Sequence, residues 1–171
     1  MRIIGIDPGI ARTGFGVIDF ISGQLTLLEY GCIQTPASLP APVRLQQIYN
    51  KLQEILNRHK PSQFAIEELF FNKNSRTALA VGEGRGVAIL TAASANLPVC
   101  EYTPLQIKQA VTGYGRSTKQ QVRYMVKAIL KLKELPNPDD IADALAVAIC
   151  HAYMATKNQL INHTGTTLMN L

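Results

Sequence analysis

The sequence predicts an α/β fold in which helices flank a five-stranded mixed sheet. Three observations support this expectation: apolar runs separated by turn residues open the chain, apolar runs and helical patterns then alternate, and the remainder is helical in pattern. With 171 residues, of which 47% are hydrophobic and 17% charged, the chain has the length of one domain and can bury a core.

Three strands are expected in succession at the start of the chain. Residues 2–6, 14–20 and 25–33 are apolar runs, and the pairs Pro8-Gly9 and Ser22-Gly23 between them are turn signals. Short connections of this kind predict a meander of consecutive strands.

Helices and strands alternate beyond this meander. Apolar positions between Val43 and Leu56 recur at helical spacing, and the pattern ends near His59, before Pro61. Strands are then expected at residues 63–67 and 98–102. Further helices are expected at residues 75–95, 104–111, 118–132 and 138–155.

The domain organisation and the location follow from the same features. One domain is expected over residues 1–155, followed by a polar, poorly ordered tail over residues 156–171. No stretch approaches the ~20 apolar residues of a membrane span, and the first residues lack a signal-peptide pattern, so a cytoplasmic protein is expected. Cys32, Cys100 and Cys150 lie far apart among apolar neighbours, which favours reduced thiols over a disulfide framework or a zinc cluster.

Basic and acidic residues are segregated along the chain. Lys and Arg number 17 against 12 Asp and Glu, and the net charge of +5 indicates an anionic partner. Residues 102–133 contain no acid, and their basic residues are Lys108, Arg116, Lys119, Arg123, Lys127, Lys131 and Lys133. Lys119, Arg123, Lys127 and Lys131, the basic stripe, recur every four residues. A solvated helix face and a set of phosphate contacts both fit the stripe, and the lack of balancing acids favours nucleic acid.

Acidic residues end two of the predicted strands. Asp7 follows the first apolar run and precedes Pro8-Gly9, and Glu67 and Glu68 end the run at residues 63–67. An Asp at such a turn can simply cap it. Two carboxylates delivered to one edge of a sheet raise each other's pKa unless a cation intervenes, so the pattern indicates a metal site.

A third group of acids opens the last predicted helix. Asn137 and Pro138 are typical of a helix start, and Asp139 and Asp140 suit the positive end of the helix dipole. Asp143 shares a face with both, so spacing alone does not choose its partner. Carboxylates are ligands that Mg²⁺ and Mn²⁺ prefer, and two such ions can promote phosphodiester hydrolysis. An acidic site beside a basic stripe therefore fits a nuclease.

The order of these motifs resembles the RuvC-type Holliday junction resolvases over residues 1–153. The motifs that carry the resemblance are Gly5-Ile6-Asp7-Pro8-Gly9, residues 13–17, Ala65-Ile66-Glu67 with Phe70, residues 84–88 and residues 140–146. The resemblance implies an RNase H-like fold, a homodimer, a branch-migration motor complex as partner, and Mg²⁺-dependent paired nicking of four-way junction DNA in recombination and repair.

The family register assigns roles to single residues. It implies that Asp7, Glu67, Asp140 and Asp143 hold two Mg²⁺ ions, with Mn²⁺ as a possible substitute, and that Asp139 is a neighbour. Asp7 is the candidate to bridge both ions. Lys108 and Lys119 correspond to basic residues near the active site, where they can bind the reacting phosphate. Solvated surface charge is the alternative for both lysines.

Further residues are expected at the DNA. Phe70 matches an aromatic that stacks on a base opened at the junction, and Phe71 is either a core residue or a second wedge. Arg76, Arg85, Arg116, Arg123 and Lys127 are expected to contact DNA. Glu68 departs from the family, which often has a neutral polar residue there. Because strand neighbours face opposite sides, only one of Glu67 and Glu68 can enter the site.

The predicted helix at residues 75–95 is a candidate dimer interface. Ala78, Gly82 and Gly86 recur at four-residue spacing and allow a close approach, either of a second helix or of the protein's own sheet. A two-fold junction needs matching cuts, which a C₂ pair of sites supplies.

Three other functions fit parts of the sequence. An ATPase half of the actin and sugar-kinase type can open with a similar strand, but the length leaves no second lobe, and Phe15-Gly16 stands where a P-loop needs Lys-Ser/Thr. A non-catalytic DNA-binding module would use the basic surface alone. A general RNase H-type nuclease is the nearest alternative.

Overall fold

A computed structural model describes the backbone of residues 1–68 and 75–167 and the side chains of residues 1–68 and 79–156. Its five strands are β1 (Arg2–Asp7), β2 (Arg12–Ile21), β3 (Gln24–Gln34), β4 (Gln63–Glu67) and β5 (Val99–Tyr102). They form one sheet in the order β3-β2-β1-β4-β5. The pairs β1–β2 and β2–β3 are antiparallel, while β1–β4 and β4–β5 are parallel. The predicted five-stranded mixed sheet is confirmed.

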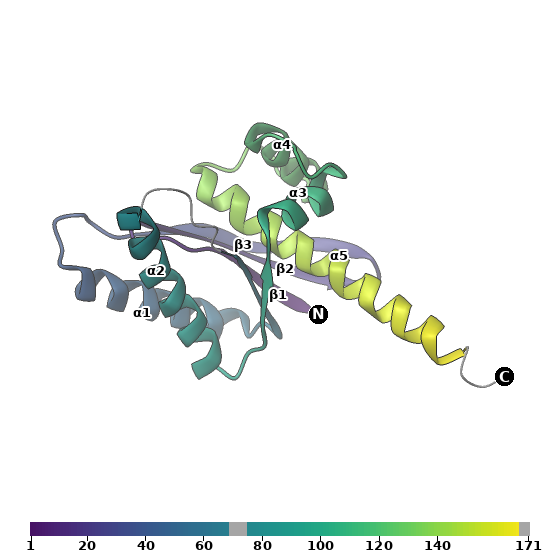
Figure 1. Cartoon of the computed structure of the whole chain (residues 1–171), viewed down its shortest axis with the longest axis horizontal. Helices are drawn as coiled ribbons and strands as arrows, with labels where there is room; N and C mark the ends of the chain where they lie inside the picture. Colours follow the sequence, from purple (N-terminus) through teal and green to yellow (C-terminus); the bar gives the residue numbers. More distant parts are fainter. Residues whose placement is uncertain (69–74, 168–171) are drawn as a thin grey trace.

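Helices cover both faces of the sheet (Figure 1). They are α1 (Ala41–His59), α2 (Ser75–Ser94), α3 (Pro104–Thr112), α4 (Lys119–Ile129) and α5 (Asp139–Thr167). Helices α1 and α2 pack on one face, and α5 crosses the other with α3 and α4 beside it. Within the described ranges, no helix combines the length and the apolar character needed to cross a membrane.

The last helix continues further than its pattern predicts. Helix α5 runs to Thr167, beyond the end expected near residue 155, so much of the polar segment is helical. Residues 168–171 lie outside the described residues, and the order of the whole tail stays a prediction.

Alternation along β1 separates two cores. Ile3 faces α5, whereas Ile4 and Ile6 face α1 and α2, and all three are fully buried. The first turns of α5 after its acids are buried on nearly every side, from Ala144 to Cys150, as expected of a helix between a sheet and two other helices. The three cysteines are free, and only Cys150 is fully buried.

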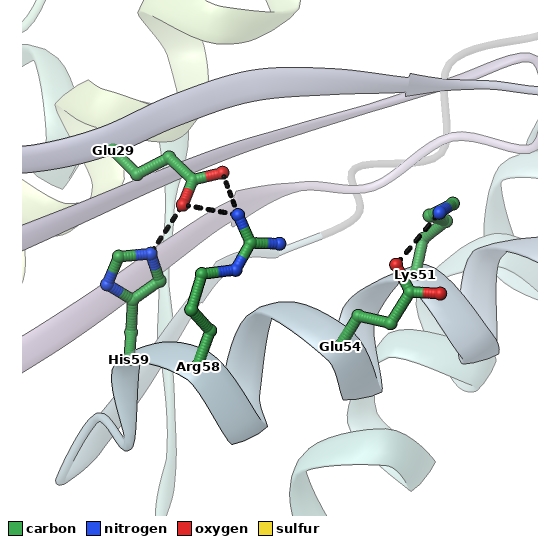
Figure 2. A network of polar contacts seen from close by, with 5 residues as sticks. All are labelled: Glu29, Lys51, Glu54, Arg58 and His59. Atoms are coloured by element: carbon green, nitrogen blue, oxygen red, sulfur yellow. Dashed lines mark hydrogen bonds and ion pairs between the residues drawn. The ribbon is translucent and has the colours of Figure 1, made fainter.

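A charged network attaches the end of α1 to the edge strand β3 (Figure 2). The Glu29 carboxylate lies 2.5 Å from His59 Nε2 and accepts hydrogen bonds from Arg58 Nη1 at 3.0 and 3.1 Å. Lys51 and Glu54 form a separate pair along α1, at 2.8 Å. The contacts of Glu29 therefore join α1 to β3, whereas the Lys51–Glu54 pair lies within the helix.

Candidate active site

Two strand ends place two carboxylates side by side. Strands β1 and β4 run parallel with Ile6 opposite Ile66, and each strand ends one residue later, at Asp7 and Glu67. Both acids therefore lie at the same edge of the sheet. In α/β sheets, this carboxyl edge is where ligands commonly bind.

Helix α5 carries two more acids to this edge. Gly14 pairs with Asp7 in the β1–β2 ladder, and a Cβ at Gly14 would overlap the Asp140 carbonyl. The α5 backbone thus rests directly on β2, and Gly14 is needed because any side chain would push the helix away. Asp143 lies about one turn further along α5.

The four acids at this edge interact electrostatically. Burial, together with the charges of Asp143, Glu67 and Asp140, raises the pKa of Asp7 to about 8. Burial and then Asp143 raise the pKa of Glu67 to about 7. Burial and mutual repulsion both disfavour the charged forms of these carboxylates, and a divalent cation bound between them would relieve both effects.

Two lysines stand beside the acids. Lys119 Nζ lies 3.1 Å from Asp143 Oδ2, and this pair raises the pKa of Lys119. Lys108 lines the same cavity of about 150 Å³, whose other walls are Glu67, Pro104, Ile107, Lys119, Val122 and Asp143. Capping boxes fix the helices that carry the lysines, from Thr103 to Gln106 in α3 and from Thr118 to Gln121 in α4.

Arg12 is a charged residue at the site that sequence reasoning missed. Its Nε lies 3.2 Å from Asp140 Oδ2, although no hydrogen bond joins them. Arg12 begins β2 directly after the turn that follows Asp7, so the hairpin brings it back to the same edge. The position of Arg12 follows from the register of the β1–β2 hairpin, which the sequence alone does not give.

The donor set fits a divalent cation that prefers oxygen ligands. Asp140 Oδ2 is a buried atom with no hydrogen-bond donor, and the four acids at this edge are all carboxylates. Among the described side chains, no three potential ligands are gathered tightly enough to hold one ion. Two basic side chains neutralise part of the acidic charge: Arg12 pairs with Asp140, and Lys119 pairs with Asp143.

Two arginines expected at DNA are engaged within the protein. Arg85 contacts the Glu101 carboxylate and donates to the Glu67 carbonyl at 3.3 Å. Arg123 pairs with Asp139 at 2.8 Å and donates to the Pro136 carbonyl, also at 2.8 Å.

The other predicted contacts are placed less fully. Arg116 is exposed between α3 and α4, and Lys127 is half-buried on α4. Phe70 and Phe71 lie outside the described residues, as does the side chain of Arg76. Glu67 lines the cavity and Glu68 does not, in agreement with their alternation along the chain.

Curated relatives match almost the whole chain. The protein of Pelotomaculum thermopropionicum, named crossover junction endodeoxyribonuclease RuvC, is 58% identical over 156 residues, covering 91% of this chain and 95% of that protein. The protein of the same name from Brevibacillus brevis is 57% identical over 152 residues, covering 89% and 92%.

Solved structures match the fold. The structure of T. thermophilus RuvC in complex with a Holliday junction substrate has a TM-score of 0.88 at 39% identity, covering 92% of this chain and 96% of that one. The yeast mitochondrial Holliday junction resolvase Ydc2 has a TM-score of 0.67 at 14% identity, covering 99% and 84%, which supports the fold alone. The RNase H-like fold is confirmed.

Residues 3–151 match a family model described as crossover junction endodeoxyribonuclease RuvC. The match includes the sheet, the acidic edge and most of the helices. A match of this extent, together with relatives at 58% identity, assigns the family from the sequence, independently of the geometry. The chain belongs to the RuvC family of crossover junction endodeoxyribonucleases.

Proposed function

We propose that this protein resolves four-way (Holliday) DNA junctions by paired symmetric nicks, in homologous recombination and DNA repair. The observation that carries the proposal is the convergence of Asp7, Glu67, Asp140 and Asp143 at one edge of the sheet. The T. thermophilus relative, at 39% identity, has been captured with a Holliday junction substrate, which supports the same substrate here.

We infer that the four carboxylates hold two Mg²⁺ ions, with Mn²⁺ as a substitute. Their oxygen donors suit both ions, and Asp7, between the other acids, is the candidate to bind both. When bound, the ions supply an activated water and stabilise the leaving oxygen in phosphodiester hydrolysis.

The lysines serve the phosphate. The Lys119 side chain is 72% exposed, so its ammonium can leave Asp143 and bind a phosphate oxygen as negative charge builds there. Lys108 stands on the wall of the same cavity and can hold the adjacent phosphate. Arg116 and Lys127 are proposed to contact the DNA backbone further out, and Phe70 and Arg76 are proposed on the resemblance alone.

We propose a homodimer that forms through α2. Leu79 and Leu90 are 68% and 59% exposed, and Glu83 and Gly86 between them are also exposed. The spacing of these four residues puts them on one face, which we call the α2 stripe. Of the small residues noted in the sequence, Gly86 lies on this stripe, Gly82 is half-buried, and the side chain of Ala78 is outside the described residues.

The cellular setting follows from the proposed substrate. Because the proposed substrate is a junction formed in DNA recombination and the curated relatives are bacterial, we propose that the protein acts in the cytoplasm. A branch-migration motor complex, which would move the junction to a cleavable position, is the proposed further partner.

Nicking of a synthetic four-way junction tests the function. We expect the wild type to nick opposed strands symmetrically in Mg²⁺, to spare linear duplex of the same sequence, and to stop in EDTA. Asp7→Asn should bind the junction without cutting it. Glu54→Gln, which alters an exposed acid on α1, is the matched control and should cut normally. Undiminished nicking by Asp7→Asn would refute the proposed site.

A competition assay separates the nearest alternative. A general RNase H-type nuclease would cut an RNA–DNA hybrid at least as well as the junction, and excess hybrid would then suppress junction cutting. We expect excess hybrid to leave junction cutting unchanged. Membership in an endodeoxyribonuclease family weighs against both the ATPase and the non-catalytic interpretation.

A further inference from the structure

Two ion pairs join α4 to the start of α5. Lys119 pairs with Asp143, and Arg123 pairs with Asp139. The partners are four residues apart on each helix and run in opposite directions, so they form a two-rung ladder. The rung nearer the beginning of α5 involves Asp139, to which the family register gives no ligand role.

Arg123 makes its polar contacts within the protein. Its Nη1 lies 2.8 Å from Asp139 Oδ1, and its Nη2 donates to the Pro136 carbonyl at 2.8 Å. Its Nε is buried without an acceptor among the described residues. The side chain is 26% exposed, against 72% for Lys119 on the same helix. The guanidinium thus joins the first residue of α5 to the segment that precedes the helix.

The position of this segment matters for the acidic edge. Asp139 directly precedes Asp140, whose carbonyl seats α5 on Gly14, and it lies about one turn before Asp143. A shift of the segment at Pro136 would therefore move both acids relative to Asp7 and Glu67, which are fixed on strands.

We propose that Arg123 is a positioning residue for the nuclease site rather than a phosphate contact. By binding Asp139 and the Pro136 carbonyl together, it fixes the first turn of α5 and hence the placement of Asp140 and Asp143 relative to Asp7 and Glu67. This inference rests on the proposed function, because it assigns Arg123 to the support of the metal-binding acids.

A phosphate contact is the competing role. An open groove of about 320 Å³ lies beside Arg123, lined by Lys119, Gln120, Arg123, Leu135 and Asp139. An anion in this groove would lie near the cations Lys119 and Arg123, but it would also be repelled by the Asp139 carboxylate, which is already paired with Arg123. The charge arrangement therefore favours the internal role.

Mn²⁺ affinity without DNA distinguishes the two roles, because electrostatics and positioning predict opposite signs. Removing a positive charge near an acidic site should by itself tighten Mn²⁺ binding. If Arg123 positions the acids, Arg123→Gln should instead weaken Mn²⁺ binding, by ~10-fold as for other residues that orient metal ligands. Lys133→Gln, an exposed change beyond α4 and outside the basic stripe, is the charge-matched control and should not weaken it.

Three further measurements complete the test. Arg123→Gln should slow single-turnover nicking by ~10-fold, with junction affinity in EDTA and its salt dependence unchanged. Asp139→Asn should weaken Mn²⁺ binding too, and the double variant should be little worse than Arg123→Gln, because both changes remove one contact. Arg123→Lys, which keeps the charge but cannot bridge both acceptors, should restore only part of the Mn²⁺ affinity.

The contrary results are equally distinct. The inference is overturned if Arg123→Gln leaves Mn²⁺ affinity unchanged or tighter, or if it weakens junction binding and lowers the salt slope by about 1, as a lost phosphate contact would. Mn²⁺ binding requires no cleavage. A wild type that binds Mn²⁺ but cuts no junction would therefore refute the proposed function, and the Mn²⁺ affinities of the wild type and Arg123→Gln would still decide this inference.

Discussion

Asp7 is held where its charge is poorly tolerated in the absence of a cation. It is the acid on which burial and the other three carboxylates act together, and its pKa rises from 3.8 to about 8. Near neutral pH, a metal-free site therefore keeps protons that a bound divalent ion would displace. Proton release and metal binding should be coupled at this residue.

The stability of the metal-free protein should fall as pH rises. Folding raises the pKa of Asp7 to about 8 and that of Glu67 to about 7, so the folded state holds protons that the unfolded state has lost. Stability then decreases between about pH 4 and pH 8. Asp7→Asn removes the main charge and should stabilise the metal-free protein at pH 8 by on the order of 1–3 kcal/mol.

Thermal unfolding in EDTA from pH 5 to pH 8 checks this prediction. Addition of Mg²⁺ at pH 8 should raise the Tm of the wild type more than that of Asp7→Asn. Glu54→Gln, at an exposed position, should follow the wild type throughout. An Asp7→Asn protein that is less stable than the wild type at pH 8 without metal would contradict the argument.

Lys119 should matter more to the chemical step than to binding. Its ammonium forms an ion pair with Asp143 at 3.1 Å, whereas Lys108 lines the cavity and acts on Glu67 only through its charge. Lys119→Gln should slow single-turnover nicking by ~100-fold, as the loss of a group that stabilises developing charge does elsewhere. Junction affinity measured in EDTA should change little.

Lys108→Gln is the comparison for this prediction. It removes an equal charge from the same cavity and should slow nicking less than Lys119→Gln. Equal effects of the two variants, confined to junction affinity, would show that both lysines serve only as surface charge.

At the level of elements, the seat of α5 on the sheet decides where two of the acids lie. Gly14 meets the Asp140 backbone carbonyl, which cannot move without the helix, whereas Gly16 meets the flexible end of the Leu145 side chain. Gly14→Ala should therefore cost about 2–3 kcal/mol of unfolding free energy, at the upper end for overpacking, and Gly16→Ala should cost less.

Mn²⁺ affinity gives a second readout for the seat of α5 on β2. Gly14→Ala should also weaken Mn²⁺ binding, since displacement of α5 carries Asp140 away from Asp7. Gly16→Ala controls for added volume on the same strand and should retain Mn²⁺ affinity. If Gly16→Ala proves the more damaging change in both assays, α5 does not rest on β2 in this way.

The elements could be predicted largely from local signals, but their contacts could not. Turn pairs such as Pro8-Gly9 and the period of apolar residues predict the five strands and the helices close to their observed bounds. The extension of α5 to Thr167 is not predicted, because the polar residues after 155 carry no apolar period. The choice between Asp139 and Asp140 needed the family register, since both share a face with Asp143.

The basic stripe shows why partners escape such reasoning. Lys119 and Arg123 lie on one helix face with no acid nearby in sequence, which favoured DNA contact for both. Their acidic partners, Asp143 and Asp139, lie on a different helix and become neighbours only when α4 packs on α5. Arg12 and Asp140 meet in the same way, through the β1–β2 hairpin and the seat of α5.

At the scale of the whole molecule, α2 links the acidic edge to the proposed dimer interface. A Cβ at Gly84 would lie 3.1 Å from the Ile10 nitrogen, so the inner side of α2 touches the loop after Asp7. Arg85 on the same helix donates to the Glu67 carbonyl. The opposite side carries the exposed α2 stripe. A partner bound there would therefore set the distance between two acidic sites through one rigid helix.

Disruption of the α2 stripe should uncouple the two nicks. Leu90→Arg places a charge where a 59% exposed leucine would become buried against its copy, and it should convert the dimer to a monomer in sedimentation at micromolar concentration. The monomer keeps Asp7, Glu67, Asp140 and Asp143, so its Mn²⁺ affinity should remain near that of the wild type. On a cruciform plasmid, where paired cuts linearise the circle, the variant should release nicked circles first.

Leu28→Arg, at a 38% exposed leucine on β3, is the control and should leave both the dimer and the paired cuts intact. A Leu90→Arg protein that stays dimeric and still linearises the plasmid directly would show that the two copies meet on another face, because a buried arginine without a partner is too costly to accommodate at the centre of an interface.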